Sequence, residues 1–110
     1  MPITEQMDQQ LKAHIEFLFS GNAKIVRCVY YHPTSESCCA IGHMLTQAKK
    51  EELAYSTKKI SSVELTEDDF KEEWRWIASE TILMIHIQNI FDDSRCNTPE
   101  KFWHYFEDRI

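Results

Sequence analysis

The sequence predicts a small, mainly α domain (α+β) of four helices, with one short β-hairpin between the first two. The chain has 110 residues, the length of a single compact domain with one modest core. It is 43% hydrophobic and 12% aromatic, which is typical of a globular protein and not of a disordered one. It has only two glycines and three prolines, which are too few for the many turns of an all-β sandwich.

Residues 4–19 are expected to form the first helix. Thr4 is a suitable N-cap, and the pair Gly21-Asn22 is a suitable stop, because both residues tolerate the left-handed backbone that ends helices. Between them the apolar residues have the spacing of one helical face: Met7, Leu11, Ile15 and Leu18.

The hairpin is expected next. Residues 24–32 are rich in β-branched and aromatic side chains, which predicts a strand, and residues 32–37 have a turn-like composition. Only residues 36–38 then remain for a second strand. A second helix is expected from Ser37 or Cys38 to about residues 52–55. Gly42 weakens this helix by about 1 kcal/mol relative to alanine, so we expect another backbone to pack closely against it.

Residues 56–65 have the weakest pattern and are expected to be a loop. A long helix is then predicted to follow Thr66, which can form a capping box with Asp69. The apolar spacing of residues 70–91 predicts one continuous helix about 33 Å long, which would be the central element of the fold.

Residues 92–97 form a polar connection before the last helix. They resemble a calcium loop only superficially, since the positions that an EF-hand fills with glycine and glutamate hold Asn97 and Trp103. Thr98, Pro99 and Glu100 form a typical helix start. The predicted buried face of the last helix consists of Phe102, Trp103, Phe106 and Ile110.

The charge is negative and uneven. The net charge is −6; residues 1–55 have six acids and five bases, whereas residues 56–110 have twelve acids and seven bases. No cluster of lysines and arginines is larger than a pair, which argues against direct nucleic-acid binding. No secretory signal or membrane-spanning run is visible, so we expect a cytoplasmic protein with reduced cysteines.

Two short stretches resemble a family of small uncharacterised bacterial and phage proteins. Residues 38–45, CCAIGHML, are similar to the family's Cys-x-Leu-Gly-Ala-Leu pattern, with His43 where a small residue is usual. The stretch from Phe91 to Phe102 is similar to a later segment of the family, with Asp92 where asparagine is usual. The resemblance covers about half of the chain. It implies a compact helical fold with a small β element, suggests a phage or mobile-element origin, and supplies no known activity that could be transferred to this chain.

The cysteines offer two weaker hypotheses. Cys38, Cys39 and His43 could bind zinc, with Cys28, His32 or Cys96 completing the site, which would make the protein a zinc- or redox-linked regulator. A nucleophile could be built from Cys38 or Cys39 with His43, His32 or His104. Buried thiols that act as small apolar groups are the more common alternative, so we expect no metal, no other cofactor and no catalytic residue.

The acidic run from residue 64 to residue 73 is the strongest functional feature. We expect Glu67, Asp68, Asp69, Glu72 and Glu73, together with Trp76, to bind a protein with a basic surface, such as a nucleic-acid-binding host complex. Acids in a first helical turn are also favoured by the helix dipole, which accounts for part of the run. With the resemblance, the most specific hypothesis is a phage-encoded inhibitor of a host defence system, for example an anti-CRISPR protein. A self-associating structural protein, dimerising through residues 103–105, is a further alternative.

Overall fold

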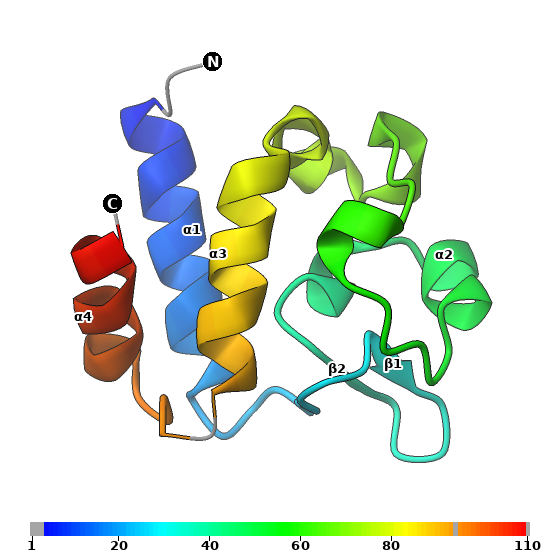
Figure 1. Ribbon diagram of the computed structural model, residues 1–110, viewed down its shortest axis with the longest axis horizontal. Coiled ribbons are helices and arrows are strands. Elements are labelled where there is room, and N and C mark those ends of the chain that lie inside the picture. The colour runs from blue at the N-terminus through cyan, green and yellow to red at the C-terminus, as the bar shows by residue number, and fades with distance from the viewer. Residues whose placement is uncertain (1–3, 94, 110) are drawn as a thin grey trace.

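The computed structural model describes residues 4–93 and 95–109 of the chain, and it confirms the predicted fold class. Within these residues, four helical segments are eight residues or longer, and an antiparallel hairpin lies between the first two (Figure 1). The radius of gyration of 13.0 Å is that of a folded chain of this size. The elements in chain order are α1 (Glu5–Leu18), β1 (Tyr31–His32), β2 (Ser37–Cys38), η1 (Gly42–Met44), α2 (Gln47–Glu52), η2 (Ile60–Ser62), η3 (Glu67–Asp69), η4 (Glu72–Ser79), α3 (Thr81–Asp92) and α4 (Pro99–Arg109).

Three α-helices form one half of the molecule. Figure 1 shows α1, α3 and α4 side by side, with α4 packed against both α1 and α3. Their contacts are apolar and aromatic: the rings of Phe19 and Phe91 lie 5.9 Å apart, and Phe91 and Phe102 are fully buried. Burial of large aromatic side chains is the main source of stability in a core of this size.

The two ends of α1 and the start of α4 agree with the sequence predictions. The Thr4 hydroxyl accepts a hydrogen bond from the Met7 amide and caps α1, and Gly21 has a φ of +87° just after the helix. Thr98 caps α4 through the Lys101 amide, and Phe102 and Phe106 face the core while Trp103 is half-buried. The fourth predicted core residue of α4, Ile110, lies outside the described residues.

The second half of the molecule contains the hairpin and a series of short turns. The hairpin pairs Tyr31 with Cys38 and His32 with Ser37, as expected, but the predicted first strand from Lys24 is wrong in length. Only an isolated bridge, Ile25 with Cys38, forms before β1. The chain leaves the extended conformation at Cys28, which has a left-handed φ of +72°.

The second helix begins later than the predicted start at Ser37 or Cys38. Residues 42–44 form a short 3-10 turn, Leu45 is extended, and α2 starts only after Thr46, whose hydroxyl caps it. The expected close approach at Gly42 is confirmed, because a Cβ on this residue would overlap the carbonyl oxygen of Tyr30. The glycine is required because η1 packs directly against the backbone of Tyr30, the residue before β1.

The predicted 33 Å helix is broken twice. Phe70 is extended and pairs with Leu45, while the Lys71 amide donates to the Met44 carbonyl at 2.9 Å. Residues 72–79 then form a 3-10 helix, and Glu80, with a ψ of 60°, separates it from α3. Phe70, Trp74 and Ile77 are buried, as their apolar spacing predicts. At residues 69–71, however, backbone hydrogen bonds to residues 44–46 replace those of a continuous helix.

Candidate functional site

The acidic segment, which we define as residues 64–73, lies on the surface around η3 and the start of η4. Its backbone is fixed at the C-terminal end of η3: the Asp69 carbonyl accepts from the Thr46 amide, and Phe70 bridges to Leu45. The segment is thus held by the second half of the core and is not a free helical turn. This attachment gives its side chains a defined arrangement.

Four of the predicted acids are exposed and form no ion pair within the described part of the chain. These carboxylates belong to Glu67, Asp68, Glu72 and Glu73. Lys71, which lies among them in sequence, contributes positive charge instead to the neighbourhood of His14 and His43. The surface therefore presents four carboxylates whose charge no described lysine or arginine neutralises by direct pairing.

Asp69 has a structural role that separates it from the other acids. Its carboxylate accepts a hydrogen bond from the Thr66 amide at 2.8 Å, which forms the predicted capping box. The same carboxylate lies 3.8 Å from the Lys49 ammonium, whose side chain is only 11% exposed. The negative charge of Asp69 is thus partly compensated within the protein by Thr66 and Lys49.

Trp76 is half-buried, with one edge bonded to α1. Its indole N–H donates to the Gln10 side chain at 3.0 Å, and the Gln10 amide donates to the Glu73 carbonyl at 2.7 Å. In a 3-10 helix residues three apart are aligned, so one glutamine contacts both residues of this row. Gln10 was missed in the sequence analysis, since a polar residue on an exposed helix face has no distinctive pattern.

The cysteine hypotheses are not supported by the geometry. Cys38 and Cys39 are buried, and burial raises the pKa of the Cys38 thiol and raises that of Cys39 to about 12. The Nε2 atom of His43 lies 3.0 Å from the Lys24 carbonyl oxygen, so this nitrogen is engaged in a hydrogen bond. In residues 4–93 and 95–109, no three histidine, cysteine, aspartate or glutamate side chains come together to hold a metal ion.

A pair of histidine rings joins the two halves of the molecule. His14 in α1 is buried, and its Nε2 atom lies 2.9 Å from the Ala40 carbonyl oxygen. Because a carbonyl can only accept, the proton of the neutral ring is on Nε2. Burial lowers the pKa of His14 to about 4, and it also lowers the pKa of His43, whose ring centroid lies 6.4 Å away.

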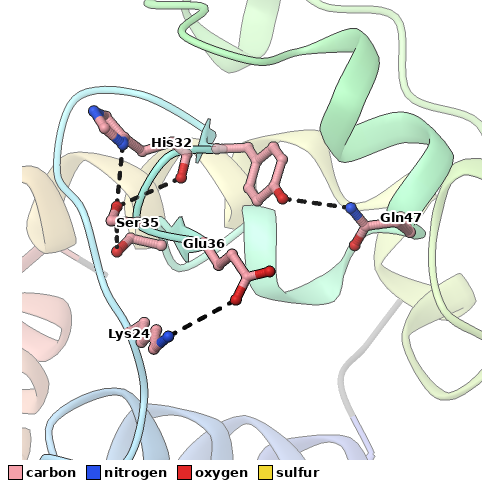
Figure 2. Close-up of polar contacts among 7 residues, drawn as sticks. Lys24, His32, Ser35, Glu36 and Gln47 are labelled. Carbon is pink, nitrogen blue, oxygen red and sulfur yellow. Dashed lines mark hydrogen bonds and ion pairs between the residues drawn. The ribbon is translucent and has the colours of Figure 1, made fainter.

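The tip of the hairpin contains a serine–histidine contact. Figure 2 shows Ser35 Oγ bonded to His32 Nδ1 at 3.1 Å and to the Ser37 hydroxyl at 2.9 Å. Glu36, in the turn of the hairpin, pairs at 3.8 Å with Lys24 from the segment before β1, and both side chains are exposed (Figure 2). Within the described residues no carboxylate bonds to the His32 ring, so the third group that orients a catalytic histidine is absent there. These contacts close the turn.

Comparisons with protein-family models, with characterised proteins and with solved structures give no match to this chain. In the part of the chain that the structure describes, no helix combines the length and the apolarity needed to cross a membrane. The geometry and the charge of the surface are therefore the basis for a functional proposal.

Proposed function

We propose that the protein is a non-enzymatic binding module that recognises a basic protein surface through its acidic segment. The observation that supports this proposal is a set of four exposed carboxylates, those of Glu67, Asp68, Glu72 and Glu73, which form no ion pair with any other described residue. They lie on backbone that is fixed by hydrogen bonds to residues 44–46. A partner can neutralise them without first breaking internal ion pairs, which favours rapid and specific association.

Trp76 is half-buried and lies three residues after Glu73 in η4, so its exposed part can supply apolar contact area on the same side of the 3-10 helix. Aromatic side chains commonly provide much of the binding energy at interfaces, and acidic neighbours increase the association rate with a basic partner. A lysine- or arginine-lined groove that normally binds nucleic acid has the matching charge. An inhibitor of a phage-defence complex is a specific form of this proposal and depends on the family resemblance alone.

The test compares two charge variants of equal net charge. The first neutralises the acidic segment by Glu67→Gln, Asp68→Asn, Glu72→Gln and Glu73→Gln, and leaves Asp69 in place. The second removes four exposed acids elsewhere by Glu5→Gln, Glu16→Gln, Glu51→Gln and Glu100→Gln. Tagged versions of both, and of the parent chain, are used to purify a stoichiometric partner from host lysate, and the affinity of the purified partner is then measured at low and high salt.

We expect the first variant to bind at least about 10-fold more weakly and to lose most of the salt dependence, while the second binds like the parent. Circular dichroism and thermal unfolding establish that both variants are folded. Equal affinity of the first variant and the parent would refute the proposal, and so would equal weakening by both variants, which would show an effect of net charge only.

A further inference from the structure

A cavity of about 290 Å³ opens beside α3, on the side that faces η2. Figure 1 shows the chain around η2 next to α3, and contacts between the two elements confirm this arrangement. Three stretches of chain line the cavity: residues 28–30, residues 57–60, and the α3 side chains of Ile85, Gln88, Asn89 and Asp92. Its volume is close to the lower end of the range for small-molecule sites.

The inner wall of the cavity is already hydrogen-bonded. The Tyr30 hydroxyl donates to the Lys58 carbonyl at 2.7 Å, which joins two of the three stretches. Gln88, only 8% exposed, donates to the Asp92 carboxylate at 3.2 Å. Such contacts keep the cavity formed without a ligand, so a ligand would not have to supply the free energy to order it.

The charged groups of the cavity differ in how far they are compensated. Asp92 accepts hydrogen bonds from the Cys28 amide and from Gln88, and the positive charge of Arg27 lies near it. Lys58 and Lys59 are exposed and form no ion pair within the described residues. Lys58 and Lys59 therefore bring to the lining of the cavity positive charge that no described acid pairs with.

The backbone at Cys28 is strained where it lines this cavity. Its left-handed φ of +72° is unfavourable for a residue with a Cβ, and it is maintained by the hydrogen bond to Asp92 and by Arg27, which donates to the carbonyls of Phe91 and Cys96. Strain of this kind concentrates at binding sites. The remaining wall is apolar, with Val29, Ile60 and Ile85.

We propose that this cavity binds a small organic carboxylate, with the acid group at Lys58 and Lys59 and an apolar body against Val29, Ile60 and Ile85. Asn89 at the rim can donate to the same carboxylate. The site is independent of the acidic segment, so it does not depend on the function proposed above. It gives the protein a ligand class that is distinct from a protein partner.

The first experiment uses three probes with the same ring and different charge: phenylacetate, phenylacetamide and phenethylamine. Binding is followed by amide chemical shifts and by the rate at which a thiol reagent modifies Cys28, which is the exposed one of the four cysteines. We expect phenylacetate to bind with a dissociation constant of about 1 mM, to shift the amides of residues 28–30, 57–60 and 85–92, and to slow modification of Cys28. The neutral amide is expected to bind about 10-fold more weakly, since it loses the charge-assisted contacts.

The second experiment removes the lysine charges by the double variant Lys58→Met and Lys59→Met, which retains the long apolar stems. We expect this variant to bind phenylacetate about 10-fold more weakly and to bind phenylacetamide unchanged. The matched control, Lys12→Met with Lys101→Met, removes two exposed lysines that do not line the cavity and is expected to bind like the parent.

Several results would overturn the proposal. One is the absence of shifts in the cavity residues at millimolar phenylacetate with Cys28 modification unchanged. Another is equal binding of the carboxylate and the amide, which would show an apolar cavity without charge selection. Tighter binding of phenethylamine would show that Asp92, and not the lysine pair, selects the ligand.

Discussion

The two halves of the molecule are stabilised in different ways. In the helical half, α1, α3 and α4 satisfy their own backbone hydrogen bonds and contact one another through buried apolar side chains. In the other half, from β1 to η4, short elements bond to each other across the sequence, as in the contacts of Tyr31 with Ala54 and of Leu45 with Phe70. The first kind of stability depends on side-chain area and the second on close backbone approach.

This difference bears on where the candidate sites lie. The acidic segment belongs to the irregular half, and the cavity lies at the border between the halves. An irregular backbone that is fixed by distant hydrogen bonds can present side chains in directions that a helix does not allow.

Gly42→Ala tests the close approach in the irregular half. The new Cβ would overlap the Tyr30 carbonyl oxygen, and backbone cannot move aside as a side-chain end can, so we expect a loss of about 3 kcal/mol in the free energy of unfolding. The control is Gly21→Ala, where no atom lies within 4 Å but φ is +87°, and a loss of about 1 kcal/mol is expected. Urea unfolding measures both. A loss in Gly42→Ala no larger than that in Gly21→Ala would show that the close approach to Tyr30 does not require the glycine.

His14 tests the contact between the halves through pH. Its folded pKa of about 4 lies below the ordinary histidine value of 6.5, so the unfolded chain binds the proton more tightly and stability falls as the pH drops from 6.5 towards 4. This residue alone should make the protein about 2 kcal/mol less stable at pH 5 than at pH 7.

The check on His14 is the variant His14→Gln, whose amide can still donate to the Ala40 carbonyl. Urea unfolding at the two pH values should show most of this pH dependence lost in the variant and retained in the control His32→Gln. Identical pH dependence in parent and His14→Gln would show that another group titrates.

Gln10→Ala tests how firmly the acidic segment is attached to α1. The variant loses the hydrogen bonds to Trp76 and to the Glu73 carbonyl, both partly exposed, so a loss of about 1 kcal/mol is expected. Amide exchange should accelerate in residues 72–79 and tryptophan fluorescence should shift. The neighbouring exposed residue gives the control, Gln9→Ala, which should change neither. If partner binding weakens in Gln10→Ala while all four carboxylates remain, the fixed arrangement of the acids matters as well as their charge.

The sequence was most informative where a helix carries its own signals. Thr4 and Gly21 mark the two ends of α1, and Thr98 marks the start of α4. These ends are predictable because capping is a contact between residues close in sequence. The hairpin was located correctly, and its strand Lys24–His32 was overextended because the left-handed conformation of Cys28 depends on Asp92, 64 residues away. The exposed acids of the candidate surface were visible from composition, whereas the separate role of Asp69 depends on Lys49.

The fold class, the capped helices, the tight packing at Gly42 and the acidic run were thus predictable from the sequence. Each of these follows from local chemistry or from the apolar pattern of one element. Contacts between distant residues could not be predicted: they divide residues 66–91 into several elements, attach the acidic segment to Gln10 and form a cavity beside α3. In each case groups far apart in sequence satisfy one another's hydrogen bonds, and at residues 69–71 these bonds outweigh the local preference of the chain for a helix.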